Sequence, residues 1–157
     1  MLSSLETRGT AARCILRVEG CVVPLHQWSL LRHLPSLEQL TIKNCSDLTC
    51  SSPDFLRGLT CLEDLIVEDC ESIVSLPERL LGDLTSLKVL EVRDCKAIKT
   101  LPDSISQLTG LQSLHIYGCA QLERWCELEE NKMKLAHIKI NTLATLSFYS
   151  NWDMMCE

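Results

Sequence analysis

The sequence predicts an α/β fold in which about six copies of one short unit stack so that their strands form a single parallel sheet. A nine-residue pattern begins at Leu37, Leu62, Leu87 and Leu111, so the copies are spaced by 25, 25 and 24 residues. Apolar residues alternate within each copy, as they do on a strand with one buried face. Because a unit of this size cannot bury its own leucines, neighbouring units must stack and share one core.

The strand segment of each unit follows the pattern L-x-x-L-x-[IV]-x-x-C. The four regular copies read LEQLTIKNC, LEDLIVEDC, LKVLEVRDC and LQSLHIYGC. Two less regular copies extend the series: RCILRVEGC from Arg13, and LAHIKINTL from Leu135, where Leu143 stands in place of the cysteine. Terminal repeats are commonly irregular. We therefore place six units, beginning near residues 13, 37, 62, 87, 111 and 135.

The rest of each unit returns the chain to the start of the next strand. An apolar residue follows the cysteine, two units continue with Leu76-Pro77 and Leu101-Pro102, and the segment ends in L-T-x-L. Proline favours an extended residue before it and can begin a short helical turn. We expect short helical or irregular returns on the outer side of the sheet.

The repeats occupy residues 13–143 and leave a flank at each end. Residues 1–12 fit no complete unit and offer no apolar cover, so we expect the first repeat strand to present an open edge. Residues 144–157 hold Phe148, Tyr149 and Trp152 close together. We expect these aromatic side chains to form a cap over the last unit, which a stacked repeat needs for solubility.

The cysteine at the end of each strand predicts a structural column, which we call the cysteine ladder. A thiol is compact, donates weakly and tolerates an apolar setting. The chain has ten cysteines but no C-x-x-C and no H-x-x-x-H, so the spacing gives no support for a metal site. No secretory signal is evident at the start, which favours reduced thiols and a cytoplasmic protein. The ladder residues are Cys21, Cys45, Cys70, Cys95 and Cys119.

The composition of the chain argues against nucleic acid as a partner and against a membrane-spanning segment. The chain has 157 residues and a formal net charge of −6. A negative chain is poorly suited to nucleic acid, whose phosphates need Lys and Arg to neutralise them. No apolar run is long enough to span a bilayer. These observations argue against nucleic acid and against a membrane span, and they say little about protein partners. We expect no cofactor.

The stretch LPERLLGDLTSLKVLEVRDCKAIKTLPDSISQLTGLQSLHIYGC, from Leu76 to Cys119, resembles a known family. It is similar to the C-terminal leucine-rich-repeat domain of plant intracellular nucleotide-binding leucine-rich-repeat disease-resistance proteins. The similarity extends over about residues 13–143. Secreted plant repeats usually carry Asn at the ladder position and a G-x-I-P return, and neither occurs here.

The resemblance implies a curved solenoid with the sheet on its concave face and the returns on its convex face. It implies a role in defence, in which the repeats sense a pathogen effector or a modified host protein and hold the receptor's nucleotide-binding domain inactive until then. The chain has no G-x-x-x-x-G-K-[ST] loop, so nucleotide binding is not carried over. We expect either an excised repeat domain or a truncated member of the family.

The candidate binding residues lie on the sheet face that points away from the core. Counting from the first residue of each unit, positions three, five and seven should be exposed there. Position seven alternates in charge from Glu19 to Arg93, which is consistent with mutual neutralisation or with a partner site. Ile66 and Val89 are apolar at exposed positions, and such a cluster can mark an interface. The predicted partner-binding residues are Asp64, Ile66, Glu68, Val89, Glu91, Arg93, His115 and Tyr117.

Three other interpretations stay open at this stage. One is an intracellular repeat scaffold unrelated to immunity. Another is an enzyme, which would need a reactive cysteine outside the ladder beside a base; no such arrangement is evident around Cys50, Cys61, Cys126 or Cys156, and we expect no catalysis. A third is a metal site at His115 and His137, predicted to lie on neighbouring strands but without a third ligand. We expect Trp28 to pack its return, whereas Trp125 is either packed or exposed.

Overall fold

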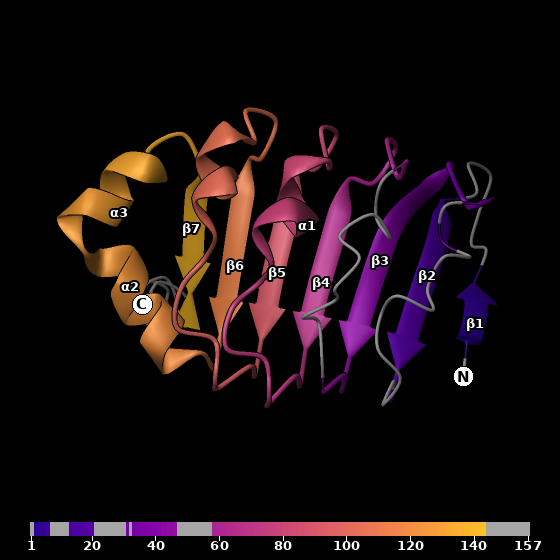
Figure 1. Ribbon diagram of the computed structural model, residues 1–157, viewed down its shortest axis with the longest axis horizontal. Helices are drawn as coiled ribbons and strands as arrows, with labels where there is room; N and C mark the ends of the chain where they lie inside the picture. The colour runs from indigo at the N-terminus through magenta and orange to yellow at the C-terminus, as the bar shows by residue number, and fades with distance from the viewer. Residues whose placement is uncertain (1, 7–12, 21–30, 32, 47–57, 144–157) are drawn as a thin grey trace, which may run out of the picture.

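The strands form one sheet in the order of the sequence. The computed structural model describes residues 2–6, 13–20, 31, 33–46 and 58–143. Six strands, β2 to β7, run parallel to one another, and β1 pairs antiparallel with β2 (Figure 1). This arrangement confirms the predicted parallel sheet and gives an α/β fold of repeating units. The strands are β1 (Leu2–Glu6), β2 (Cys14–Glu19), β3 (Leu37–Lys43), β4 (Asp64–Glu68), β5 (Val89–Arg93), β6 (Ser113–Tyr117) and β7 (Lys139–Thr142).

The returns lie together on one side of the sheet, in front of the strands in Figure 1. Pro77 and Pro102 are extended residues that directly precede the short helix α1 (Glu78–Gly82) and the 3₁₀ helix η3 (Asp103–Gln107). Proline suits this position because its fixed φ and missing N–H cost nothing at a helix start. The last return differs, since it forms the helices α2 (Ala120–Glu127) and α3 (Glu129–Lys134).

The core lies between the sheet and the returns. Positions four and six of β2 to β6 are buried, whereas their neighbours at three, five and seven are mostly half-buried or exposed. The first leucine of each regular unit and the leucines of the L-T-x-L segments are also part of the core. Each column joins equivalent residues of successive units, so the core is one continuous stack. The strand columns are Leu40, Leu65, Leu90 and Leu114, and Ile42, Val67, Val92 and Ile116.

The prediction of an open edge at the first repeat strand is wrong. Strand β1 pairs antiparallel with β2, with Leu5 opposite Leu16 and Glu6 opposite Ile15. Residues 2–6 do not carry the repeat pattern, so the periodicity of the sequence does not predict this strand. A strand that covers the edge of a sheet forms backbone hydrogen bonds with the free N–H and C=O groups of that edge. It does not need the apolar pattern of the repeats to do so.

The predicted start of the last unit, near residue 135, is wrong by two residues. Ser113 pairs with Lys139 and His115 pairs with Asn141, so position three of this unit is Lys139 rather than His137. The two helices of the last return use more chain than a Leu-Pro return, which moves the strand along the sequence. Leu143 is consequently not the equivalent of a ladder cysteine, and it is 55% exposed.

In five units the residue before the cysteine has a left-handed backbone conformation, which was not predicted from the sequence. The φ angles are between 50° and 68° at Gly20, Asn44, Asp69, Asp94 and Gly118. Gly, Asn and Asp are the residues that adopt this conformation most readily. The column G-N-D-D-G was visible in the sequence and indicates a sharp turn at the end of each strand.

Candidate partner-binding face

We call the sheet face that points away from the core and the returns the open face. It consists of the residues at positions three, five and seven of the strands. The eight predicted binding residues all lie on this face, on the adjacent strands β4, β5 and β6. Their register pairs Asp64 with Val89, Ile66 with Glu91 and then His115, and Glu68 with Arg93 and then Tyr117.

Charges on the β2–β4 part of the open face are paired with one another. The Lys43 Nζ lies 3.3 Å from a Glu68 carboxylate oxygen and 3.3 Å from an Asp69 carboxylate oxygen. Arg17 lies 3.8 Å from Glu68 and 3.7 Å from Glu19. The hydrogen bonds with Asp69 and Glu68 raise the pKa of Lys43. In this part of the open face the alternating charges neutralise one another, and the Glu68 carboxylate is paired with Lys43 and Arg17.

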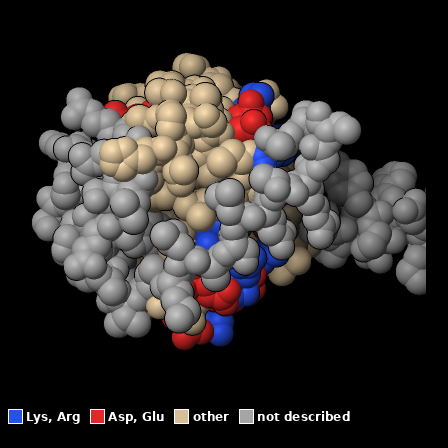
Figure 2. Space-filling view, turned by 90° about the vertical axis from the view of Figure 1, so that its right-hand side faces the viewer, with Lys and Arg blue, Asp and Glu red and all other residues tan. Residues whose placement is uncertain are grey.

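A second charged network joins the beginnings of the strands. Arg13 lies 2.9 Å from Glu38, 3.6 Å from Glu63 and 3.2 Å from Asp64, and Lys88 lies 2.7 Å from Glu63. The hydrogen bond that Arg13 donates to Glu38 raises the pKa of Arg13, and the hydrogen bond that Lys88 donates to Glu63 lowers the pKa of Glu63. Figure 2, which views the molecule from the β1 end, shows acidic and basic groups intermixed there. Such exposed pairs each contribute about 0–1 kcal/mol.

The β5–β6 part of the open face carries what we call the Tyr117 cluster, formed by Glu91, Arg93, His115 and Tyr117. The Arg93 guanidinium lies over the Tyr117 ring, 5.8 Å from its centroid, and also contacts the Glu91 carboxylate. The Tyr117 hydroxyl lies 3.0 Å from Nδ1 of His115. These contacts fix the positions of the Tyr117 ring and the Arg93 guanidinium relative to each other.

Apolar residues lie beside this cluster at the centre of the open face. Ile66 and Val89 are half-buried, and Ile66 pairs with Glu91 on one side and with Thr41 on the other. Thr41 is 5% exposed, so the prediction that position five is exposed is wrong at this residue. The centre of the open face therefore combines partly covered aliphatic side chains with the Tyr117 cluster.

The ladder cysteines form a chain of hydrogen bonds between units. Each thiol donates to the carbonyl two residues before it, at 3.3 Å for Cys70 and Cys95 and 3.4 Å for Cys119. The sulfurs of Cys95 and Cys119 each accept the backbone N–H of the preceding ladder cysteine, at 3.4 Å. Cys45 is also buried. Cys21 lies outside the described residues. These contacts give the four described ladder cysteines a structural place at the turn.

Thiol labelling should separate these cysteines from Cys61. Cys61 is exposed, whereas Cys45, Cys70, Cys95 and Cys119 are buried. Burial prevents attack until the structure opens locally, so we expect the four buried thiols to label at least about 100-fold more slowly than Cys61. Mass spectrometry after timed exposure to an alkylating reagent measures each site. Comparable rates at all five sites in the native protein would contradict the structural role.

Alkaline pH should weaken the fold through Cys126 on α2. Burial, together with Glu123 and Glu127, raises the pKa of this thiol from 9.0 to about 12. Between these values the folded protein holds a proton that the unfolded chain has lost, so the free energy of unfolding falls as pH rises, by at most about 1.4 kcal/mol per pH unit. Denaturant unfolding at increasing pH measures this slope. Cys126→Ala should reduce it, and an unchanged slope would contradict the assignment.

The predicted histidine pair does not form. His115 on β6 faces Asn141, whereas His137 precedes β7 and its Nε2 lies 3.2 Å from the Leu108 carbonyl. Trp125 is half-buried and packs against the core, and Trp28 and the predicted aromatic cap lie outside the described residues.

Within the described ranges, no group of three or more His, Cys, Asp or Glu side chains is placed to hold a metal ion. The helices of the same ranges include none that is long and apolar enough to cross a membrane. Comparison with known proteins finds no family model that matches the chain and no significantly similar curated sequence.

Proposed function

We propose that this chain is a leucine-rich-repeat solenoid whose open face is the concave, partner-binding surface. Its units of 24 to 26 residues, its parallel strands in sequence order and its cysteine column support this architecture. In such a stack each unit contacts only its neighbours, so the sheet is a rigid platform. A rigid platform loses little conformational entropy when it binds.

The function that the geometry supports best is protein recognition. The observation that carries it is the centre of the open face, where Ile66 and Val89 lie beside the Tyr117 cluster. Tyrosine and arginine are enriched among the residues that dominate binding energy at interfaces. Aliphatic groups that are at least partly exposed and have a charged rim can mark interaction sites. Glu68 and Asp64 are paired within the protein and form part of that rim.

By resemblance to the plant receptor family, we propose that recognition serves defence in the cytoplasm. The partners would be a pathogen effector or a host protein that it modifies, and the nucleotide-binding domain that the repeats hold inactive. The role is that of a non-catalytic module. The resemblance in residues 76–119 supports this proposal, together with the polar, partly apolar open face.

Affinity purification with paired variants tests the proposal. Arg93→Ala with Tyr117→Ala removes the centre of the cluster, and Lys96→Ala removes a cation from the exposed turn after Cys95 as a control. We expect a protein partner that wild type and the control retain and that the double variant loses. With purified components, Kd should rise at least about tenfold for the double variant. Equal retention by a double variant that is folded by circular dichroism would contradict binding at the open face.

A further inference from the structure

A cavity of about 420 Å³ lies on the opposite side of the sheet from the open face. Its walls are the two Leu-Pro returns, Leu76-Pro77 and Leu101-Pro102, and the helices α2 and α3, of which α2 contributes Trp125. The volume is within the usual range of sites for small ligands. None of the eight residues proposed to bind a partner on the open face lines this cavity.

The cavity exists because the stacking of returns is interrupted. Ser75 and Thr100 form a parallel bridge, and the Lys99 N–H donates to the Val74 carbonyl at 3.1 Å, so two extended returns lie side by side. The next return is helical, since Ala120–Glu127 forms α2. A helix cannot continue a row of extended segments, and a recess remains between Thr100 and Trp125.

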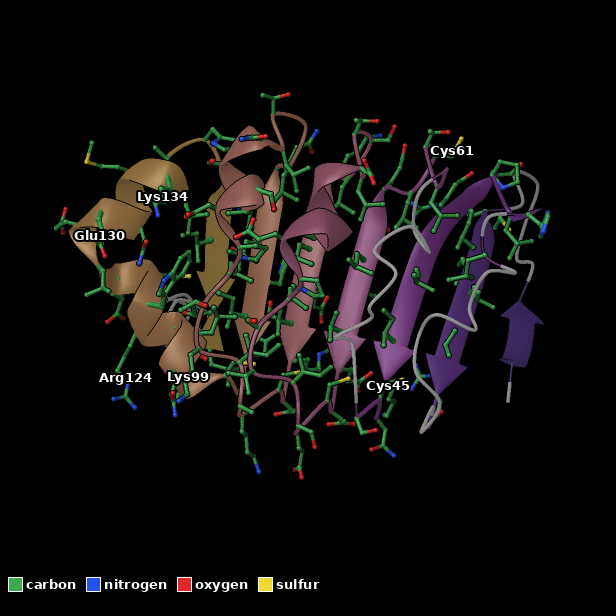
Figure 3. The ribbon with its side chains drawn as sticks, in the orientation of Figure 1. Cys45, Cys61, Lys99, Arg124, Glu130 and Lys134 are labelled. Atoms are coloured by element: carbon green, nitrogen blue, oxygen red, sulfur yellow. The ribbon has the colours of Figure 1, made fainter. Side chains whose placement is uncertain are left out.

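The rim of the recess is negatively charged. Glu78, Asp103 and Glu130 contribute three carboxylates and Lys134 one ammonium, which gives a net charge of −2 at neutral pH. Lys134 Nζ lies 2.7 Å from Asp103. That hydrogen bond, and the charges of Asp103, Glu130 and Glu78, raise the pKa of Lys134. Because its net charge is negative, the rim favours cations. Figure 3 shows Glu130 and Lys134 on the same helix, α3.

Two polar side chains that line the recess, those of Glu130 and Asn131, have an oxygen atom that can accept a hydrogen bond from a ligand. The Glu130 carboxylate has no hydrogen bond or ion pair among the described residues, whereas both carboxylate oxygens of Glu78 accept backbone N–H groups at the start of η3. Asn131 is 2% exposed and lines the cavity. Its Nδ2 donates to the Trp125 carbonyl at 2.8 Å, and within the described part of the chain its Oδ1 receives no donor.

We propose that this recess binds the cationic side chain of an extended peptide, with arginine preferred over lysine. A planar guanidinium can stack on the Trp125 ring and pair with the Glu130 carboxylate at the same time. It can also donate to the Oδ1 of Asn131, because it carries five N–H groups in a fixed geometry. The described residues hold no set of ligands for a metal ion, so an organic cation is the occupant that fits.

Titration with short peptides tests this proposal on the full chain. The probes are acetyl-Gly-Arg-Gly-amide and its Lys and Gln counterparts, and the readout is the indole N–H resonance of Trp125, assigned with Trp125→Phe. We expect a saturable shift with the Arg peptide, a weaker one with the Lys peptide and none with the Gln peptide.

Paired variants on α3 make the result specific. Glu130→Gln should weaken binding of the Arg peptide at least about fivefold, because it removes a charge-assisted hydrogen bond. Glu129→Gln is the matched control, since Glu129 is 88% exposed and pairs with Lys132 outside the recess. The control should change affinity less than twofold. Equal responses to the Arg and Gln peptides, or equal affinities for the two variants, would overturn the proposal.

Discussion

Leu90→Ala should destabilise the protein by about 2–5 kcal/mol, the largest effect that we expect from a single substitution. Leu90 is fully buried at position four of β5, between Leu65 of β4 and Leu114 of β6. Truncating it removes apolar contacts with both neighbouring units and leaves a cavity that a close-packed stack fills only in part. Denaturant unfolding followed by far-ultraviolet circular dichroism measures the loss.

Val89→Ala on the same strand is the control for this experiment. Val89 is half-buried on the open face, so its truncation should cost under about 1 kcal/mol. If both variants lost the same free energy of unfolding, the assignment of β5 side chains to core and open face would be wrong.

Gly118→Ala should be the second most damaging change, at about 1–2 kcal/mol. Gly118 has a φ of +67°, where any residue with a Cβ is strained. An added Cβ would also come within contact distance of the Asp94 carboxylate, which would have to move. The shift in the midpoint of thermal unfolding measures the combined effect.

Gly110→Ala provides the comparison. Gly110 does not have a positive φ, and an added Cβ would meet its nearest neighbours, the Leu87 and Thr85 carbonyls, at an ordinary 3.6 Å. Replacing glycine there restricts the unfolded chain and should change stability by no more than about 1 kcal/mol, in the stabilising direction. Equal destabilisation by the two substitutions would show that the left-handed turn before Cys119 is not required.

Prediction from the sequence worked best where the repeat is regular. From Leu37 to Tyr117 the units are spaced by 24 or 25 residues, and the strands and their register follow this spacing. The grouping of Ile66, Val89, Glu91 and Tyr117 on one face followed from the same alternation. The prediction was less accurate where the repeat pattern breaks. The length of a helical return cannot be inferred from the spacing of the strands, and β7 therefore begins two residues later than predicted.

The repeat pattern of the sequence by itself determined the parallel order of the strands, the burial of their leucines and the position of the ladder cysteines. These follow from local periodicity, which every regular copy repeats and which stacking reinforces. Only the tertiary structure decided that β1 covers the first repeat strand, which side chains Arg13 and Arg93 contact, and that a recess opens beside Trp125. Each depends on segments far apart in the chain meeting at one place, and no local pattern encodes that meeting.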